Sequence, residues 1–501
     1  MGLGFKKSVT SLLQLSSANV AVKFLGVLMI ALFTRYLTKE ELAILPVYEM
    51  LAVLSGIIFG FGLQPTFLRL LPSKYSENAD EARGMIFSGG IMMVTGSAVF
   101  ACGVFSLSGW LSSILFKEQD FTHIIKIASV GFFFISLKNL SNLVLWSKSR
   151  FDKISIIQIT AACGRAVFAG GFLLLWGIEG MTLGLVVNEI LCAAVSLYFI
   201  RDILLGPRVS LFSASDLLKQ SLPFYFEGFL NYLRLQGDNW IVATMLGPST
   251  MAIYFVAKRL PGMILMFIQS LDKVVTSELS KRKNQPEEME TYIQNLFLIN
   301  SHITLPGTIF VMGLAPLFIL VVAGQAYIAS VIPCLILCSV LPLKALQIPL
   351  IRGIFVIHPP MVRVVMTVIE SVVLILTLFL LAPPLAENGI ALSRVVAAAT
   401  ALVMAQLVLR RTIGLGLPWG QAVLSFSFSV VMAGLILGLQ LWNNNLFATP
   451  AYALAGILVF LVLVHFFNSK AYYEVLNTVL PFQLKDPVLH VINSMTRRSE
   501  S

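Results

Sequence analysis

Charged residues are scarce in this sequence: they make up 12% of the 501 residues, while hydrophobic residues make up 57%. A soluble domain carries about 25% charged residues. Apolar runs of about 20 residues, long enough to cross a hydrocarbon core of about 30 Å, recur from one end of the chain to the other. The runs are continuous rather than alternating with a period of two, which favours helices over a β-barrel. The sequence therefore predicts an all-α polytopic membrane protein.

Cysteine is also rare. The five cysteines all lie inside apolar runs, and an odd number there does not make a disulfide framework. Cys334 and Cys338 share a helix face, but no histidine or carboxylate accompanies them, so we expect no metal site. The sequence has no Walker loop and no GxGxxG motif. We therefore expect no cofactor, and transport energy would come from an ion gradient, the membrane potential or the substrate's own gradient.

The hydropathy pattern predicts about fourteen membrane spans. They cover 9–36, 42–70, 84–107, 122–146, 154–176, 182–200, 221–246, 250–276, 291–321, 329–355, 361–382, 388–409, 418–441 and 450–468. Loop lysines and arginines concentrate in alternate loops, which is the positive-inside pattern. The net charge of +10 therefore indicates orientation rather than nucleic-acid binding. We predict a multi-pass protein of the inner or plasma membrane with both termini in the cytoplasm.

An internal repeat is visible at an offset of 209 residues, where Tyr36–Leu51 aligns with Met245–Leu260. Leu37 then matches Leu246, and Ala43 matches Ala252. Six predicted spans lie between the two blocks, so both halves have the same orientation, as in a parallel repeat about an axis along the membrane normal. The predicted domains are an N-terminal six-helix lobe (1–205), a C-terminal six-helix lobe (206–413), two extra transmembrane helices (414–468) and a cytoplasmic amphipathic tail (469–501).

Several charged residues interrupt the apolar runs, at a cost of about 2.5–3.5 kcal/mol each in the middle of a bilayer. Arg234 and Asp238 are four residues apart and can pair along one helix face, and Glu227 lies two turns earlier on nearly the same face. At the repeat offset, Glu49 falls opposite Lys258. These positions predict a wet chamber between the two halves. An internal salt bridge that only fixes a helix is the alternative for Arg234 and Asp238.

Three blocks of the sequence resemble a known family. GDNWIVATMLGPSTMAIYFVAKRLPG, Gly237–Gly262, resembles the segment joining the seventh and eighth spans of the polysaccharide (O-antigen) flippase family, within the multidrug/oligosaccharidyl-lipid/polysaccharide exporter superfamily. FTRYLTKEELAILPVYEML, from Phe33, is similar to the equivalent segment of the first half, and GFGLQPTFLRLLP, Gly60–Pro72, to the end of the family's second span. Leu45 departs from the pattern, where a tyrosine is usual.

The resemblance implies two six-helix lobes around a V-shaped cationic lumen, with two extra C-terminal helices. It implies a flippase that moves a polyprenyl-diphosphate-linked oligosaccharide from the cytoplasmic to the outer leaflet by alternating access, for cell-surface polysaccharide assembly. Its partners would be that lipid-linked glycan, membrane lipids, and the polysaccharide polymerase with other assembly proteins. The residues expected to bind the anionic headgroup are Lys23, Arg234, Lys258 and Arg259, and those expected to bind a coupling ion or proton are Glu49, Asp238 and Glu227.

Two other functions fit a protein of this kind. A drug or cation antiporter of the same superfamily would need an acidic or aromatic lumen, whereas the candidates here are mostly basic. A membrane-embedded glycosyltransferase or polysaccharide polymerase would need a large outer loop, and the longest predicted outer loop has about fifteen residues. We therefore expect a transporter and not an enzyme.

Overall fold

The computed structural model describes residues 22, 24–117, 120–148, 150–204, 214–270, 275, 279–280, 282, 285–443 and 445–467. Every regular element among these residues is a helix, and none of them forms a strand. The prediction of an all-α membrane protein is confirmed. Lys23 and the predicted tail 469–501 lie outside the described residues.

The helices follow one another with short connections. The first group comprises the helix Phe24–Tyr36, α2 Lys39–Leu42, α3 Ile44–Ile58, α4 Leu63–Glu77, α5 Ala79–Ser106, α6 Ser108–Phe116, α7 Thr122–Ser147, α8 Phe151–Gly164, the π-helix η1 Arg165–Gly170, and α9 Gly171–Leu204. The second comprises α10 Ala214–Ile241, the π-helix η2 Val242–Leu246, α11 Pro248–Ala257, α12 Arg259–Ser270, α14 Pro286–Ala323, the 3₁₀ helix η3 Gln325–Ser330, α15 Val331–Cys338, α16 Val340–Ile357, α17 Pro360–Ile413, α18 Trp419–Trp442, the 3₁₀ helix η4 Leu446–Ala448, and α19 Thr449–Phe467.

The chain divides into two compact units. The first comprises the described residues of Met1–Arg259 with Phe318–Cys334 and Val364–Ala397, and the second those of Leu260–Leu317, Leu335–Arg363 and Ala398–Ser501. Parts of α14, α15 and α17 thus pack with the first unit. The predicted lobe boundaries at 205 and 413 stay a prediction.

Local sequence signals explain where the second helix of each half begins. Thr38 caps α2 with a complete capping box, in which its hydroxyl accepts from the backbone N–H of Glu41 while the Glu41 carboxylate accepts from the backbone N–H of Thr38. Gly247 precedes α11, whose first residue is Pro248, the position where proline loses no hydrogen bond. Thr38 and Gly247 are equivalent in the repeat, so both helices begin at matching positions.

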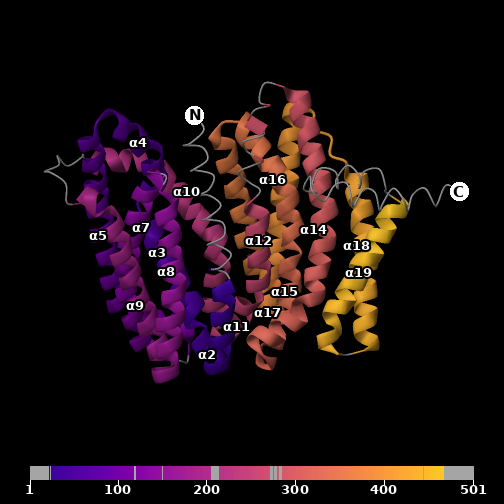
Figure 1. Ribbon diagram of the computed structural model, residues 1–501, viewed down its shortest axis with the longest axis horizontal. Coiled ribbons are helices and arrows are strands. Elements are labelled where there is room, and N and C mark those ends of the chain that lie inside the picture. Colours follow the sequence, from indigo (N-terminus) through magenta and orange to yellow (C-terminus); the bar gives the residue numbers. More distant parts are fainter. Residues whose placement is uncertain are drawn as a thin grey trace. The chain divides into compact units, whose positions relative to one another are not determined.

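In the first unit, α7 packs between α5 and α9 (Figure 1). The core between these helices and α4 contains fully buried Phe67, Met85 and Val144. In the second unit, α18 and α19 form a hairpin at the yellow end of the chain (Figure 1). The hydrophobic core of this hairpin contains Met432 and Ile436 of α18 and Ala453 of α19.

Glycine breaks a helix that the hydropathy pattern predicts as one span over 42–70. The structure shows two helices, because α3 ends at Ile58 and α4 begins only at Leu63. Gly62 has φ 68°, in the left-handed region that glycine adopts readily. The prediction of a single continuous span was therefore wrong at this point.

The predicted span 250–276 is interrupted one turn before its proline, Pro261. The structure shows two helices there, because α11 ends at Ala257 and α12 begins at Arg259. Proline fits in the first turn of a helix, where its missing N–H has no partner to lose. Pro261 therefore lies inside α12, and the break falls at Lys258.

Nine helical segments in the described part of the chain are long and apolar enough to cross a membrane. Two of them, Phe151–Ile203 and Met361–Ile413, each cover two predicted spans. The backbone turns inside them at Gly177 (φ 61°) and at Ala386 (φ 48°), between the predicted spans. The chain is thus a multi-span membrane protein, and the number fourteen stays a prediction.

Candidate functional site

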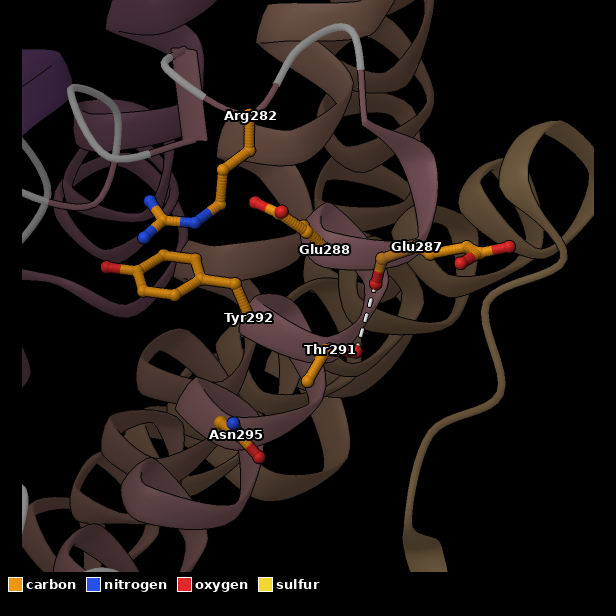
Figure 2. Close-up of a pocket in the computed structure, with 6 residues that line it drawn as sticks. All are labelled: Arg282, Glu287, Glu288, Thr291, Tyr292 and Asn295. Atoms are coloured by element: carbon orange, nitrogen blue, oxygen red, sulfur yellow. Dashed lines mark hydrogen bonds between the residues drawn. The ribbon is translucent and has the colours of Figure 1, made fainter.

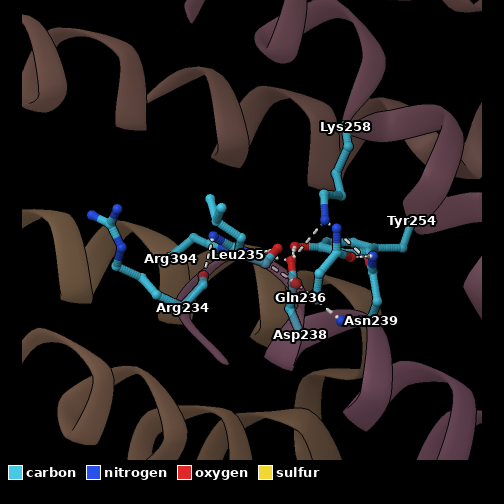
Figure 3. Close-up of polar contacts among 8 residues, drawn as sticks. All are labelled: Arg234, Leu235, Gln236, Asp238, Asn239, Tyr254, Lys258 and Arg394. Atoms are coloured by element: carbon cyan, nitrogen blue, oxygen red, sulfur yellow. Dashed lines mark hydrogen bonds and ion pairs between the residues drawn. The ribbon is translucent and has the colours of Figure 1, made fainter. Parts of the chain in front are cut away.

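Among the described residues of the first unit, the most enclosed charge is Asp238 of α10, whose side chain is fully buried. Its Oδ1 lies 2.6 Å from Arg394 Nη2 and accepts from the backbone N–H of Asn239 at 3.0 Å. Its Oδ2 accepts from Arg394 Nε at 3.0 Å, Lys258 Nζ at 3.0 Å and Tyr254 Oη at 2.7 Å (Figure 3). We call these five residues the Asp238 cluster. One carboxylate thus binds two cationic side chains, which leaves the cluster with one excess positive charge.

The two cations of the cluster differ in what else they contact. Arg394 of α17 is held further, because its Nη1 donates to the Arg234 carbonyl and its Nη2 to the Leu235 carbonyl, both at 2.9 Å (Figure 3). Lys258 Nζ donates to Asp238 and, at 3.1 Å, to Asn239 Oδ1. An ammonium has three donors, so one remains after these two bonds. Because 30% of the Lys258 side chain is exposed, the excess charge is accessible at Lys258.

Arg234 does not pair with Asp238 in the described structure, so the predicted pairing along α10 is wrong. Its guanidinium lies 3.4 Å from Glu370 Oε2 of α17 and donates to Asn231 Oδ1 at 2.8 Å. Asp238 is turned towards Lys258 and Arg394 instead (Figure 3). Spacing along one helix identifies residues that can meet, but a bidentate arginine from another helix binds a buried carboxylate more strongly.

A second carboxylate, Glu49 of α3, lies 3.4 Å from Arg259 Nη2. The Arg259 guanidinium also stacks over the Phe255 ring at 3.8 Å. Both charged side chains remain accessible, since Glu49 is 41% and Arg259 29% exposed. The repeat pairs Glu49 with Lys258, and the structure places Glu49 against the next residue along the chain, Arg259.

Two further predicted site residues are Glu227 and Lys23. Glu227 is an exposed residue of α10 and is not among the described partners of Asp238. Lys23 lies outside the described residues. Sequence reasoning missed the roles of Tyr254 and Arg394 at Asp238, and also the buried pair of Lys138 with Glu189 between α7 and α9. The only signal for Arg394 was its position within an apolar run.

A separate shallow pocket of about 430 Å³ lies in the second unit, at the start of α14 (Figure 2). Its lining residues are Arg282, Glu287, Glu288, Thr291, Tyr292 and Asn295. The Arg282 guanidinium lies over the Tyr292 ring, 4.6 Å from its centroid. Every lining side chain is exposed or half-buried. A pocket this open, with exposed acidic side chains, is typical of a solvated helix end, and we assign it no role.

Comparison with solved structures defines the class of the fold. The structure matches the lipid II flippase MurJ in an inward closed conformation with a TM-score of 0.69 and 18% identity, over 91% of this chain and 99% of that one. An inward-facing MATE multidrug resistance transporter of the MOP superfamily matches with a TM-score of 0.63 and 15% identity, over 78% and 94% of the two chains. A mutant of the Vibrio cholerae MATE transporter VcmN matches with a TM-score of 0.58 and 12% identity, over 82% and 98%. The fold is therefore that of the flippase and the MATE transporters.

The family is shown by the sequence itself. A model of the polysaccharide biosynthesis protein family matches residues 32–332. The matched region contains Glu49, Asp238, Tyr254, Lys258 and Arg259. No match was found among curated proteins. The chain belongs to the polysaccharide biosynthesis protein family.

Proposed function

We propose that this protein is a flippase, and not an enzyme, that moves a polyprenyl-diphosphate-linked oligosaccharide from the cytoplasmic to the outer leaflet of the inner or plasma membrane. In this proposal, two six-helix lobes, 1–205 and 206–413, give alternating access to a hydrated lumen. Polysaccharide polymerases and other assembly proteins would receive the product. Membership of the polysaccharide biosynthesis family and the flippase-like fold support this function.

The observation that carries the proposal is the accessible positive charge at Lys258 and Arg259. These adjacent residues lie at the break between α11 and α12, and each side chain is about 30% exposed, at 30% and 29%. An anionic phosphate is bound strongly by cationic donors, because hydrogen bonds between charged groups are shorter and stronger than neutral ones. The attraction is larger in a protein chamber than in bulk water, since the effective dielectric constant is lower.

Asp238 and Glu49, two of the carboxylates expected to bind a coupling ion or proton, differ in their contacts and exposure. Asp238 has five polar contacts and is fully buried, so protonating it would disrupt contacts with Arg394, Lys258 and Tyr254. Glu49 contacts Arg259 at 3.4 Å and is 41% exposed. We propose that Glu49, rather than Asp238, exchanges the coupling proton or cation.

The second candidate function, export of a cationic drug, is favoured by the likeness to MATE multidrug transporters. A cationic substrate needs uncompensated acidic or aromatic groups. In the described part of the first unit, Asp238 is bound by two cations and Glu49 by one. The excess of positive charge repels a cationic substrate and attracts an anionic one.

The proposal is tested by deleting the gene and analysing membrane lipids. We expect a polyprenyl-linked glycan to accumulate on the inner leaflet and surface polysaccharide to be lost. Wild-type protein should restore the polymer, whereas the double charge reversal Lys258→Glu, Arg259→Glu should not, because it converts two attractive charges into repulsive ones. The membrane content of each variant is measured by immunoblot.

The matched control is Arg201→Glu, at the exposed end of α9, where the side chain is 54% accessible and lies beside Asp202. It reverses one positive charge outside the Asp238 cluster, where the test variant reverses two, and should restore the polymer fully. Full rescue by the double reversal would exclude this site from substrate binding. Efflux of cationic dyes by the wild-type protein, with no glycan accumulation on deletion, would instead support the drug antiporter.

A further inference from the structure

Arg165 is the first residue of the π-helix η1, between α8 and α9. A π-helix is rare, and short π-helical turns inside α-helices often occur at functional sites. The sequence gives no reason for it here, because the segment RAVFAG contains no proline. The π-helical turn, which is wider than an α-helical turn, begins at Arg165, the one charged residue of this segment.

The Arg165 guanidinium makes no hydrogen bond and no ion pair with any residue that the structure describes, and its Nε is fully buried without a partner. A buried donor without a partner costs about 1–3 kcal/mol, and a charged donor costs more. Native proteins rarely retain such a group unless it has a function. Arg234 and Arg259 also have a buried Nε without a partner, but each of them, like Arg394, binds a carboxylate through the rest of its guanidinium. Arg165 differs from these three because no described carboxylate lies within ion-pair distance of it.

The charge of Arg165 is felt in the central part of α3. This charge acts on Tyr48 and on the next residue, Glu49. Arg259 and Lys258 act on the same Glu49 carboxylate. The nearby acid Glu189 also acts on Tyr48, but it is already neutralised by Lys138.

The balance of charge then decides what Arg165 can bind. Two carboxylates, Asp238 and Glu49, are surrounded by four cationic side chains, which are Lys258, Arg394, Arg259 and Arg165. The difference is two positive charges, one accessible at Lys258 and one on the unpaired guanidinium of Arg165. A diphosphate that links a lipid to a sugar carries one ionised oxygen on each of its two phosphates. The two surplus positive charges match the two ionised oxygens of such a diphosphate, one for each phosphate.

We infer that Arg165 binds one phosphate of a lipid-linked diphosphate, while Lys258 and Arg259 bind the other. The planar fork of the guanidinium suits bidentate binding of phosphate oxygens. This inference rests on the proposed function and deepens it, since it makes Arg165 the residue that distinguishes a diphosphate from a monophosphate.

The test measures binding of two defined probes, farnesyl diphosphate and farnesyl monophosphate, to the purified full-length protein in nanodiscs. The wild-type protein should bind the diphosphate more tightly. Arg165→Gln should weaken diphosphate binding about tenfold or more, the effect of losing one charge-assisted contact, and should leave monophosphate binding almost unchanged. Arg165→Lys should recover part of the preference, because it restores the charge without the fork.

Two controls separate binding from a structural effect. Arg201→Gln removes a distant exposed charge and should preserve the preference of the wild-type protein. The melting temperature of Arg165→Gln should not fall, because the substitution breaks no hydrogen bond or ion pair with a described residue; a structural arginine would give a clear loss. If wild-type protein prefers the diphosphate and Arg165→Gln keeps that preference, the role of Arg165 is wrong while the proposed function stands. If wild-type protein binds neither probe, both are wrong.

Discussion

At the scale of single residues, Asp238 shows what a buried charge needs in order to remain ionised. Removing a carboxylate from water costs several kcal/mol, and attraction to partners offsets this only when the geometry is good and the remaining lone pairs are satisfied. Asp238 meets both conditions, with a bidentate arginine, an ammonium, a phenol and a backbone N–H. The carboxylate therefore joins α17 to α10 and α11, in addition to orienting Lys258.

Asp238→Asn should destabilise the protein strongly. The change leaves Arg394 and Lys258 without a compensating charge, and breaking a buried pair in this way costs about 3–5 kcal/mol. A thermal unfolding scan in detergent should show a much lower melting temperature. The matched control is Asp202→Asn, where the carboxylate is 92% exposed and lies 3.7 Å from Arg201, and this variant should melt like the wild type. Equal melting temperatures for the two variants would show that Asp238 does not hold these helices together.

The residues of the Asp238 cluster could be predicted only in part from the sequence. Asp238 and Lys258 were visible because each interrupts an apolar run, where a charge is costly. The partner of Asp238 was predicted incorrectly, because Arg234 lies four residues away while Arg394 lies 156 residues away. No local spacing connects residues so distant in the chain. Arg165 was visible as a charge within a span, but its lack of a partner among the described residues is a property of the folded protein.

At the scale of elements, the helix breaks determine where the charged side chains lie. The segment Phe59–Gly62 separates α3 from α4, and its backbone packs directly on α10. A Cβ at Gly62 would lie 2.5 Å from the Ser221 carbonyl oxygen and 2.6 Å from the Tyr225 backbone nitrogen. Hydropathy predicted the helices well, because the apolar character of a helix is averaged over many residues. It missed this break, which depends on the left-handed torsions of Phe61 (φ 49°) and Gly62 (φ 68°) and on one close approach of backbones.

Gly62→Ala should therefore destabilise the protein. The new methyl group meets backbone atoms that cannot move aside easily, and the left-handed torsion adds strain of about 1–3 kcal/mol. The control is Gly228→Ala in α10, where a Cβ meets no atom within 4 Å. Alanine in a helix interior is better than glycine, so this variant should be as stable as the wild type or slightly more stable. A melting temperature for Gly62→Ala equal to that of Gly228→Ala would contradict the close packing of this break on α10.

At the scale of the whole molecule, the repeat found in the sequence has a direct structural counterpart. The Ser249 hydroxyl of α11 donates to the Glu40 carboxylate of α2, and the two positions are 209 residues apart, the offset of the repeat. Equivalent residues of a two-fold repeat can touch only close to the symmetry axis, so the axis that the sequence predicts should pass near α2 and α11. The sequence could identify the equivalence, and the family and fold class with it. It could not show that these two helix ends are in contact.

This contact gives a test of alternating access. If the ends of α2 and α11 must separate for the substrate to leave, a covalent link between them should stop transport. We expect Glu40→Cys, Ser249→Cys, in a background lacking the five native cysteines, to be joined by a short bis-methanethiosulfonate reagent. Treated cells should stop producing surface polysaccharide and resume when dithiothreitol removes the link. Each single-cysteine variant should be unaffected by the reagent. Continued polymer production by fully cross-linked protein would show that these helix ends stay together throughout the transport cycle.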